Sequence, residues 1–173
     1  MTASESTQAH RDAAAHRRAR CAVLTISDTR TRDTDKGGKL IIKELEAAGH
    51  ELVEYEIVPD APQQLETQLA AWLRHEPALD TILTTGGTGI ASRDTTVEVA
   101  RRFIYKELEG FGELFRMLSW DEVGPAAMLS RAVGGLAGEP LLFAMPGSTN
   151  AVGLAMSKLI IPELPHLIWE RAR

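Results

Sequence analysis

Short apolar runs of the kind that form buried strands recur along the chain, separated by stretches with helical periodicity. The runs occupy residues 22–26, 52–58, 80–83 and 141–145. Helical spacing of apolar residues follows at Leu40, Ile41, Leu45 and Ala48, at Leu65, Leu69, Trp72 and Leu73, and at Phe111, Leu114, Phe115 and Leu118. This alternation predicts an α/β fold, a three-layer α/β/α arrangement with a mostly parallel central sheet covered by helices on both faces.

The two ends of the chain depart from this alternation. Residues 1–20 are rich in Ala, Arg, His and Ser without an apolar period, so we expect a mobile N-terminal tail and a single domain over residues 21–173. Near the other end, glycines around 134–138 separate an edge-like segment from the run at 141–145. Residues 151–169 predict a closing helical region, bent or broken at Pro162 and Pro165.

Composition excludes several classes of protein. The net charge is −5 and the pI is near 5.6, with no recurring basic stripe, so a nucleic-acid partner is not expected. No continuous apolar run approaches the length of a membrane span, so no membrane association is expected. The single cysteine, Cys21, fits a buried strand position and a reducing cytoplasm. The five histidines show no metal-ligand spacing, which argues against zinc.

The stretch from Thr84 to Gly89, followed by Arg93 and Asp94, carries the strongest chemical signal. It follows a predicted strand, and hydroxyl residues and an early acid at 95–98 predict that a helix begins there. Glycines at 86, 87 and 89 let the backbone turn tightly and approach a ligand. Strand, glycine loop and helix start present backbone N–H groups to a phosphate, and Asp94 beside them suits a metal ion or a proton acceptor.

Other interpretations of this loop account for less of it. Gly87 and Gly89 begin a dinucleotide fingerprint, but Ser92 stands where its third glycine belongs, and residues 105–109 lack the expected strand and acid. The pair Gly38-Lys39 is followed by Leu40 and lacks the earlier glycine of a P-loop. A simple turn explains one glycine but not three.

Polar loops follow each of the predicted parallel strands. They are Ser27-Asp28, Pro59-Asp60, the glycine loop with Asp94, and Pro146 to Asn150. In parallel sheets ligands bind beyond the carboxyl ends of the strands. The sequence therefore predicts one site at this edge.

In these same segments the chain resembles molybdenum cofactor biosynthesis proteins of the MogA/MoaB type. The matching segments, in family order, are 25–28, 35–38, 58–60, 84–94, 109–113, 129–132 and 145–148. They span about residues 20 to 160, which is nearly the whole expected fold. The resemblance implies the molybdopterin-binding fold of that family.

The resemblance also implies a chemistry. Adenylyltransferases of the family join AMP from ATP to the terminal phosphate of molybdopterin, using Mg²⁺ and releasing pyrophosphate. By this resemblance, Asp60 and Asp94 are the expected catalytic residues and metal ligands. The expected substrate-binding residues are Ser27, Asp28, Lys36, Gly86, Gly87, Thr88, Gly89, Arg93, Ser130, Arg131, Pro146, Gly147 and Ser148.

Three functions stay open at this point. Ser148 to Asn150 and the segment 109–117 follow the MoaB-like form, and some MoaB-type proteins are thought not to catalyse adenylylation. The alternatives are therefore an adenylyltransferase, a non-catalytic molybdopterin-binding protein, or a nucleotide pyrophosphatase of the competence-damage type. The pyrophosphatases are normally longer chains with a second domain.

The region after the glycine loop predicts an oligomer. Phe103, Tyr105, Phe111, Phe115 and Trp120 gather within eighteen residues of a chain that is 5% aromatic. Aromatic side chains are favoured at interface centres. Family members form trimers or dimers of trimers, so we expect a homo-oligomer, and the resemblance adds a molybdenum-insertion protein as a candidate partner.

Overall fold

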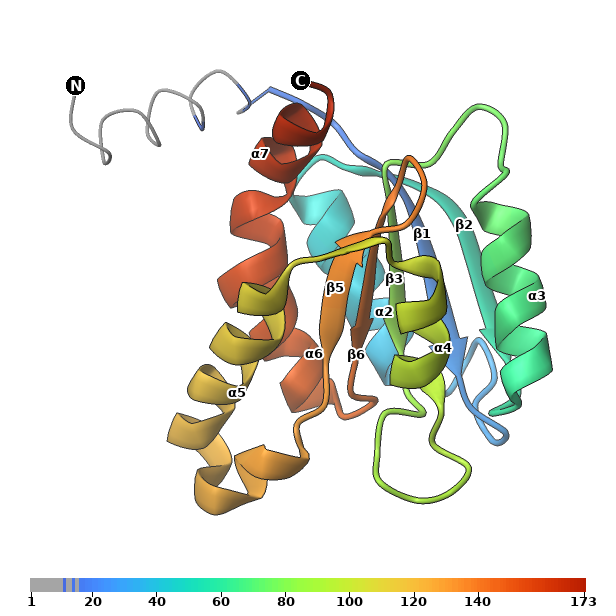
Figure 1. Cartoon of the computed structure of the whole chain (residues 1–173), viewed down its shortest axis with the longest axis vertical. Helices are drawn as coiled ribbons and strands as arrows, with labels where there is room; N and C mark the ends of the chain where they lie inside the picture. The colour runs from blue at the N-terminus through green and yellow to red at the C-terminus, as the bar shows by residue number, and fades with distance from the viewer. Residues whose placement is uncertain (1–10, 12–13, 15) are drawn as a thin grey trace.

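The computed structural model describes residues 11, 14 and 16–173. The protein folds around one six-stranded mixed sheet (Figure 1). The strands are β1 (Arg20–Ile26), β2 (Glu51–Val58), β3 (Thr81–Thr85), β4 (Lys106–Glu107), β5 (Val133–Leu136) and β6 (Leu141–Met145). Their order is β2-β1-β3-β6-β5-β4. The first four are parallel, whereas β5 and β4 run antiparallel to their neighbours.

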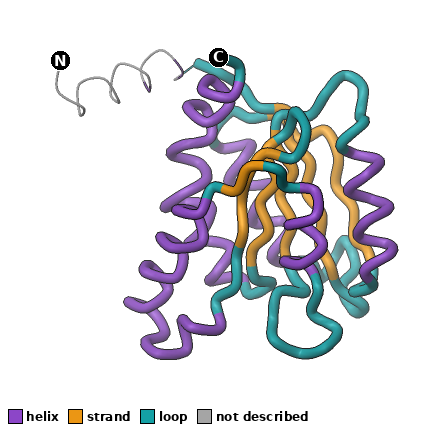
Figure 2. The backbone as a smooth tube through the Cα atoms, in the orientation of Figure 1, coloured by secondary structure: helices purple, strands orange, loops and turns teal. Residues whose placement is uncertain are grey.

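Helices cover both faces of the sheet, as the alternation predicts (Figures 1 and 2). They are α2 (Lys36–Ala47), α3 (Pro62–Trp72), α4 (Thr96–Phe103), α5 (Glu109–Val123), α6 (Thr149–Ala155) and α7 (Ile161–Arg171). Helices α2, α5, α6 and α7 pack on one face around Phe115 and Phe143, and α3 and α4 pack on the other around Leu24 and Ile82. The three-layer α/β/α prediction is confirmed.

One of the two alternatives predicted for the C-terminal helical region, a break at its prolines, is wrong. The region is not broken at its prolines but runs from α6 through a π-helical turn, η2 (Met156–Ile160), into α7. The π turn comes just before Pro162, and Pro165 lies inside α7. A π turn adjusts the local hydrogen bonding, so the absence of an N–H on Pro162 is accommodated without ending the helix.

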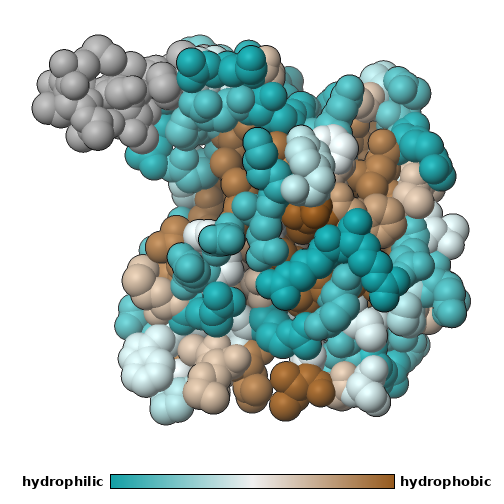
Figure 3. Space-filling model, in the orientation of Figure 1, coloured by the Kyte–Doolittle hydropathy of each residue, from teal (hydrophilic) through white to brown (hydrophobic). Residues whose placement is uncertain are grey.

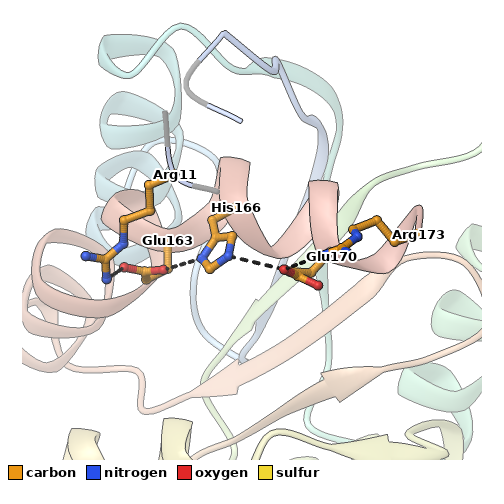
Figure 4. Close-up of polar contacts among 5 residues, drawn as sticks. All are labelled: Arg11, Glu163, His166, Glu170 and Arg173. Carbon is orange, nitrogen blue, oxygen red and sulfur yellow. Dashed lines mark hydrogen bonds and ion pairs between the residues drawn. The ribbon is translucent and has the colours of Figure 1, made fainter. Parts of the chain in front are cut away.

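The continuous helix Thr149–Arg171 is long and apolar enough to cross a membrane, by length and composition alone. No such signal appears in the sequence, because no uninterrupted apolar run in it has that length. A third of the most apolar stretch of the helix is buried, with Val152, Met156 and Leu164 fully buried in the core. The outer side of α7 instead carries a ladder of charges, in which Glu163 pairs with Arg11, His166 contacts Glu163 and Glu170, and Arg173 contacts Glu170 (Figure 4). These features are those of a core helix with one polar side.

The N-terminal part of the chain bears on two further predictions. Residues 1–10, 12, 13 and 15 of the predicted mobile tail lie outside the described residues, whereas Arg20, at the end of the predicted tail, is the first residue of β1. Cys21 is a buried strand residue, as expected, and burial raises the pKa of its thiol, which disfavours the nucleophilic thiolate.

The aromatic cluster is divided between core and surface. Phe111 and Phe115 are buried against Phe143, whereas Tyr105 and Trp120 are 68% and 57% exposed at opposite ends of the segment. Phe111 and Phe115 therefore pack on the protein's own sheet, because helix α5 turns them toward it, and the partner surface expected from the cluster is left to Tyr105 and Trp120. Exposed apolar residues instead gather on the C-terminal half of α5 and on the 3-10 helix η1 (Gly124–Leu129), seen at the lower left of Figure 3.

Candidate functional site

Four loops meet at the carboxyl edge of the parallel strands, at the lower end of the sheet in Figure 1. The Ser27 amide donates to Val58 O at 2.9 Å, and the Asp60 amide donates to Asp28 Oδ1 at 3.0 Å. The Gly86 amide donates to Met145 O at 3.2 Å. These bonds link the end of β1 to that of β2 and the end of β3 to that of β6, and the four loops that the sequence predicts at one edge all lie there.

Glycine is required at two positions of the loop that follows β3. Gly86 and Gly87 have φ angles of 101° and 62°. A Cβ on Gly86 would lie 2.3 Å from Ile26 O, and one on Gly87 would lie 2.4 Å from Thr96 Oγ1 and 3.0 Å from Asp60 Oδ1. Helix α4 begins directly afterwards, with the Thr96 amide donating to Gly87 O at 2.9 Å. The loop therefore passes close to both the helix start and Asp60.

Asp60 and Asp94 approach this loop from different elements. Asp60 follows β2 and its side chain is 12% exposed, while Asp94 lies next to Gly89 and accepts a hydrogen bond from the Ala91 amide at 3.0 Å. Burial, and then the charge of Asp94, raise the pKa of Asp60. Two carboxylates close enough to repel each other favour a cation between them.

Arg93 supplies part of that positive charge. Its guanidinium pairs with Asp28 and lies 3.8 Å from Asp60 Oδ2, measured from Nε. Among the described residues no three His, Cys, Asp or Glu side chains form a metal-binding group. Asp60 and Asp94 nevertheless fit Mg²⁺, which takes one or two carboxylates and completes its shell with water and substrate phosphates.

A small polar cavity of about 110 Å³ adjoins the glycine loop at Gly86. Residues from the ends of β1 and β3, the start of α2 and the loop after β6 line it, among them Ser27, Lys36, Gly86 and Gly147. Lys36 is exposed at the first position of α2, and Arg30 also lines the cavity. Two positively charged side chains therefore line it. This is a suitable place for a phosphate or another anion.

Asp35 is a residue of this cavity that belongs to a family-matching segment but was not among the expected site residues. Only 2% exposed, it accepts hydrogen bonds from Thr25 Oγ1 at 2.6 Å, from the Tyr55 hydroxyl at 2.7 Å and from the Gly38 amide at 2.9 Å. Burial and the bond to Asp35 raise the pKa of Tyr55. Asp35 caps α2 and so fixes the position of Lys36; an aspartate just before Gly37-Gly38 was the available signal.

The remaining expected residues lie beside the acidic pair rather than at it. Arg131 donates to Gly89 O at 3.0 Å and pairs with Glu98, so it supports the glycine loop from behind. Ser130, Pro146 and Ser148 line a larger hollow of about 770 Å³ between α6 and the end of α5. Ser148 also caps α6 by accepting from the Ala151 amide at 3.2 Å. Thr88 is buried in the loop itself.

Comparisons with known proteins agree with this arrangement. Residues 22–166 match a family described as "probable molybdopterin binding domain". The chain is 50% identical over 155 residues to molybdenum cofactor biosynthesis protein B of Bacillus anthracis, an alignment that covers 89% of this chain and 91% of that protein.

Solved structures give the same result. A crystal structure of molybdenum cofactor biosynthesis protein B has a TM-score of 0.87 at 49% identity, covering 91% of this chain and 98% of the other. The tungsten cofactor synthesizing protein MoaB from Pyrococcus furiosus has a TM-score of 0.79 at 36% identity, covering 91% and 99%. Both the sequence and the architecture are therefore shared along almost the whole length.

Proposed function

The chain belongs to the molybdopterin-binding domain family and has a role in molybdenum cofactor biosynthesis, and we propose that its reaction is the adenylylation of molybdopterin. In this reaction an oxygen of the terminal phosphate of molybdopterin attacks the α-phosphorus of ATP. The new P–O bond forms as the bond from the α-phosphorus to the bridging oxygen breaks, and pyrophosphate leaves. Such a transfer needs positioning and charge neutralisation more than covalent help from the protein.

The observation that carries this proposal is the meeting of Asp60, Asp94 and the glycine loop at one edge of the sheet. Asp60 Oδ1 lies within 3.0 Å of the position that a Cβ on Gly87 would occupy. Backbone N–H groups at 87–89 favour a phosphate, since those of Gly86 and Thr96 already donate to Met145 O and Gly87 O, and the two carboxylates would hold Mg²⁺ beside it. When bound, Mg²⁺ neutralises phosphate charge.

Neighbouring residues have the remaining roles in the proposed reaction, which are to bind phosphate, to neutralise charge and to hold the pterin. Lys36 and Arg30 face the 110 Å³ cavity and attract phosphate oxygens, while Arg93 is placed to neutralise charge that develops on the nucleotide. The larger hollow beside Ser130, Pro146 and Ser148 has the volume for a pterin. ATP and molybdopterin are thus the proposed substrates, and the two cavities lie on either side of the loop after β6.

A direct assay tests the proposal. The protein is incubated with molybdopterin, ATP and Mg²⁺, and the products are analysed by mass spectrometry. Adenylylated molybdopterin with equimolar pyrophosphate is the expected result, and its dependence on Mg²⁺ is checked with EDTA. Bound but unmodified molybdopterin would indicate the non-catalytic protein, and AMP formation without pterin would indicate the pyrophosphatase.

We also propose a cytoplasmic homo-oligomer, a trimer or a dimer of trimers, with a molybdenum-insertion protein as a candidate recipient of the product. Six of the exposed large apolar residues, Leu114, Met117, Trp120, Val123, Met128 and Leu129, lie on α5 and η1. An apolar patch of this kind is typical of an interface. Light scattering is expected to give a multiple of 18.9 kDa, and a mass near 18.9 kDa at micromolar concentration would contradict an oligomer.

A further inference from the structure

Thr96 carries a buried hydroxyl that has no partner in the fold. The residue is 1% exposed, and Thr96 Oγ1 lacks any hydrogen bond among the described residues. A buried polar group without a partner costs about 1–3 kcal/mol. The hydroxyl belongs to the first residue of α4, an eight-residue helix whose preceding residue, Thr95, makes no side-chain capping bond. The start of this helix is therefore left with unused polar groups.

The surroundings of the hydroxyl identify what is missing. Thr96 Oγ1 and Asp60 Oδ1 lie 2.4 and 3.0 Å from one point, the position of a Cβ on Gly87. Only the missing side chain of Gly87 allows the two oxygens to converge there. Asp94 precedes Thr96 by two residues in the same loop, and its charge acts on Asp60. The Thr96 hydroxyl and one Asp60 carboxylate oxygen thus face one small region beside Gly87, and Asp94 lies close enough for its charge to act on Asp60.

We propose that the Thr96 hydroxyl oxygen is a third protein ligand of the divalent cation held by Asp60 and Asp94. The inference rests on the proposed function, because that function is what places a cation at the two aspartates. Neutral hydroxyl and carboxylate oxygens are hard donors of the type that Mg²⁺ prefers. A threonine or serine hydroxyl at the start of the helix after a glycine loop binds Mg²⁺ in P-loops, and the same physical arrangement occurs here on a different loop.

A third ligand would also explain why two carboxylates suffice. The described residues contain no third acid that joins Asp60 and Asp94 in a metal-binding group. A neutral ligand completes the set without adding to the repulsion that already acts between the two carboxylates. The cation would then retain open positions for water and for the phosphates of ATP.

Direct measurement of metal binding tests the inference without relying on activity. Mn²⁺ replaces Mg²⁺, and free Mn²⁺ is titrated by electron paramagnetic resonance against the full-length protein. Thr96→Val, which keeps the shape of the side chain and removes the oxygen, should weaken Mn²⁺ binding about 10-fold or more. Thr96→Ser should retain binding close to the parent. Unchanged affinity in Thr96→Val would overturn the inference.

Thr81 offers a matched control. It is also fully buried with a hydroxyl that has no partner, but it lies at the start of β3, at the opposite end of the strand from the glycine loop. Thr81→Val makes the same chemical change and should leave Mn²⁺ affinity unaltered. Equal weakening in both variants would show that any buried threonine has this effect and would overturn the inference.

Thr96→Cys distinguishes direct ligation from an effect passed through Asp60. A thiolate is a soft ligand, so this variant should bind Cd²⁺ more tightly than the parent and show a sulfur-to-cadmium charge-transfer band in the ultraviolet. The parent, whose single thiol is Cys21 in β1, should show no such band. Tight Cd²⁺ binding by Thr96→Cys without the band would mean that position 96 does not touch the metal.

Asp60→Ala separates this inference from the proposed function. If Asp60→Ala loses Mn²⁺ binding and Thr96→Val does not, the proposed metal site stands and the role of Thr96 is wrong. If Asp60→Ala binds Mn²⁺ as the parent does, with and without ATP, the metal site itself is wrong and both proposals fail. Circular dichroism melts of every variant exclude loss of fold as the cause.

Discussion

The two ends of the sheet each hold a partly buried aspartate, and the surroundings of the two aspartates are opposite in kind. At the amino end, Asp80 is fully partnered: its carboxylate accepts from the Arg20 amide at 2.9 Å and from Arg171 Nη2 at 2.8 Å, and its backbone carbonyl accepts from Arg171 Nη1 at 3.1 Å. At the carboxyl end, the carboxylate of Asp60 has Arg93 at 3.8 Å and a second acid nearby.

This difference separates an aspartate that holds the fold together from one that we propose binds a metal ion. The partners of Asp80 come from β1 and from α7, so the aspartate ties the C-terminal helix to the first strand. The surroundings of Asp60 include Gly87, which has no side chain, and the Thr96 hydroxyl, which has no hydrogen-bond partner among the described residues. Charge that lacks compensation in the folded protein is the feature that distinguishes a candidate site from a structural ion pair.

The largest expected effect is at the carboxyl edge. Asp60→Ala and Asp94→Ala should each lower adenylylation turnover about 100-fold or more, because each removes a metal ligand whose electrostatic contribution is worth several kcal/mol. Both aspartates are in loops, so thermal stability should change little. Turnover is measured from adenylylated pterin at saturating ATP. Near-parental turnover in both variants would remove them from the reaction.

Substitution of Gly87 should damage both binding and stability. The sequence alone predicts that Gly87→Val abolishes ligand binding more than it harms stability. The structure adds a stability cost, since the new Cβ would meet Thr96 and Asp60 at a φ of 62°. Gly49→Ala is the control, because Gly49 also has a positive φ, 82°, with open space around its Cβ. Nucleotide binding by calorimetry should be lost only in Gly87→Val.

Asp80→Ala should show the reverse of the behaviour expected at Asp60. Removing the carboxylate partner of Arg171, which keeps only its backbone carbonyl contacts, should cost about 2–3 kcal/mol, or roughly 5–10 °C in melting temperature, with nucleotide binding unchanged. Glu139→Ala is the control, because Arg171 contacts the backbone carbonyl of Glu139 and not its side chain. A melting temperature equal to that of the parent would show that the Asp80 contacts contribute nothing measurable.

The smallest expected effect is a pH dependence of stability that comes from His50, near the amino ends of the parallel strands. His50 accepts a hydrogen bond from the Ala19 amide at 3.1 Å, and burial, followed by the charge of Arg18, lowers its pKa below the ordinary 6.5. The folded state therefore prefers neutral histidine. This contribution to stability is complete above pH 6.5 and is lost as the pH falls through the lowered folded-state pKa.

Urea unfolding at pH 7.5 and pH 5.5 measures this contribution. His50→Asn, whose amide oxygen can still accept from Ala19, should lose less stability on acidification than the parent. His16→Asn, at an exposed position, should behave as the parent does. An equal loss in parent and His50→Asn would assign the pH dependence to other groups.

Much of the fold could be predicted from sequence because local signals agreed with one another. The apolar runs that became β1, β2, β3 and β6, and the helical spacing that became α2, α3 and α5, report burial on a sheet or on one helix face. The two-residue strand β4 and the continuity of α6 with α7 were not predictable in this way. Both depend on pairing or packing with distant parts of the chain.

The sequence by itself identified the candidate loops: glycines at 86, 87 and 89, aspartates at 60 and 94, and an alternation of strands and helices that predicts parallel strands ending at one edge. Only the tertiary structure decided which polar groups find partners. Asp35 and Asp80 are satisfied by hydrogen bonds from residues between 3 and 91 positions away, whereas the Thr96 hydroxyl is not. Partnering depends on distances across the folded chain, and a linear pattern of residue types does not contain those distances.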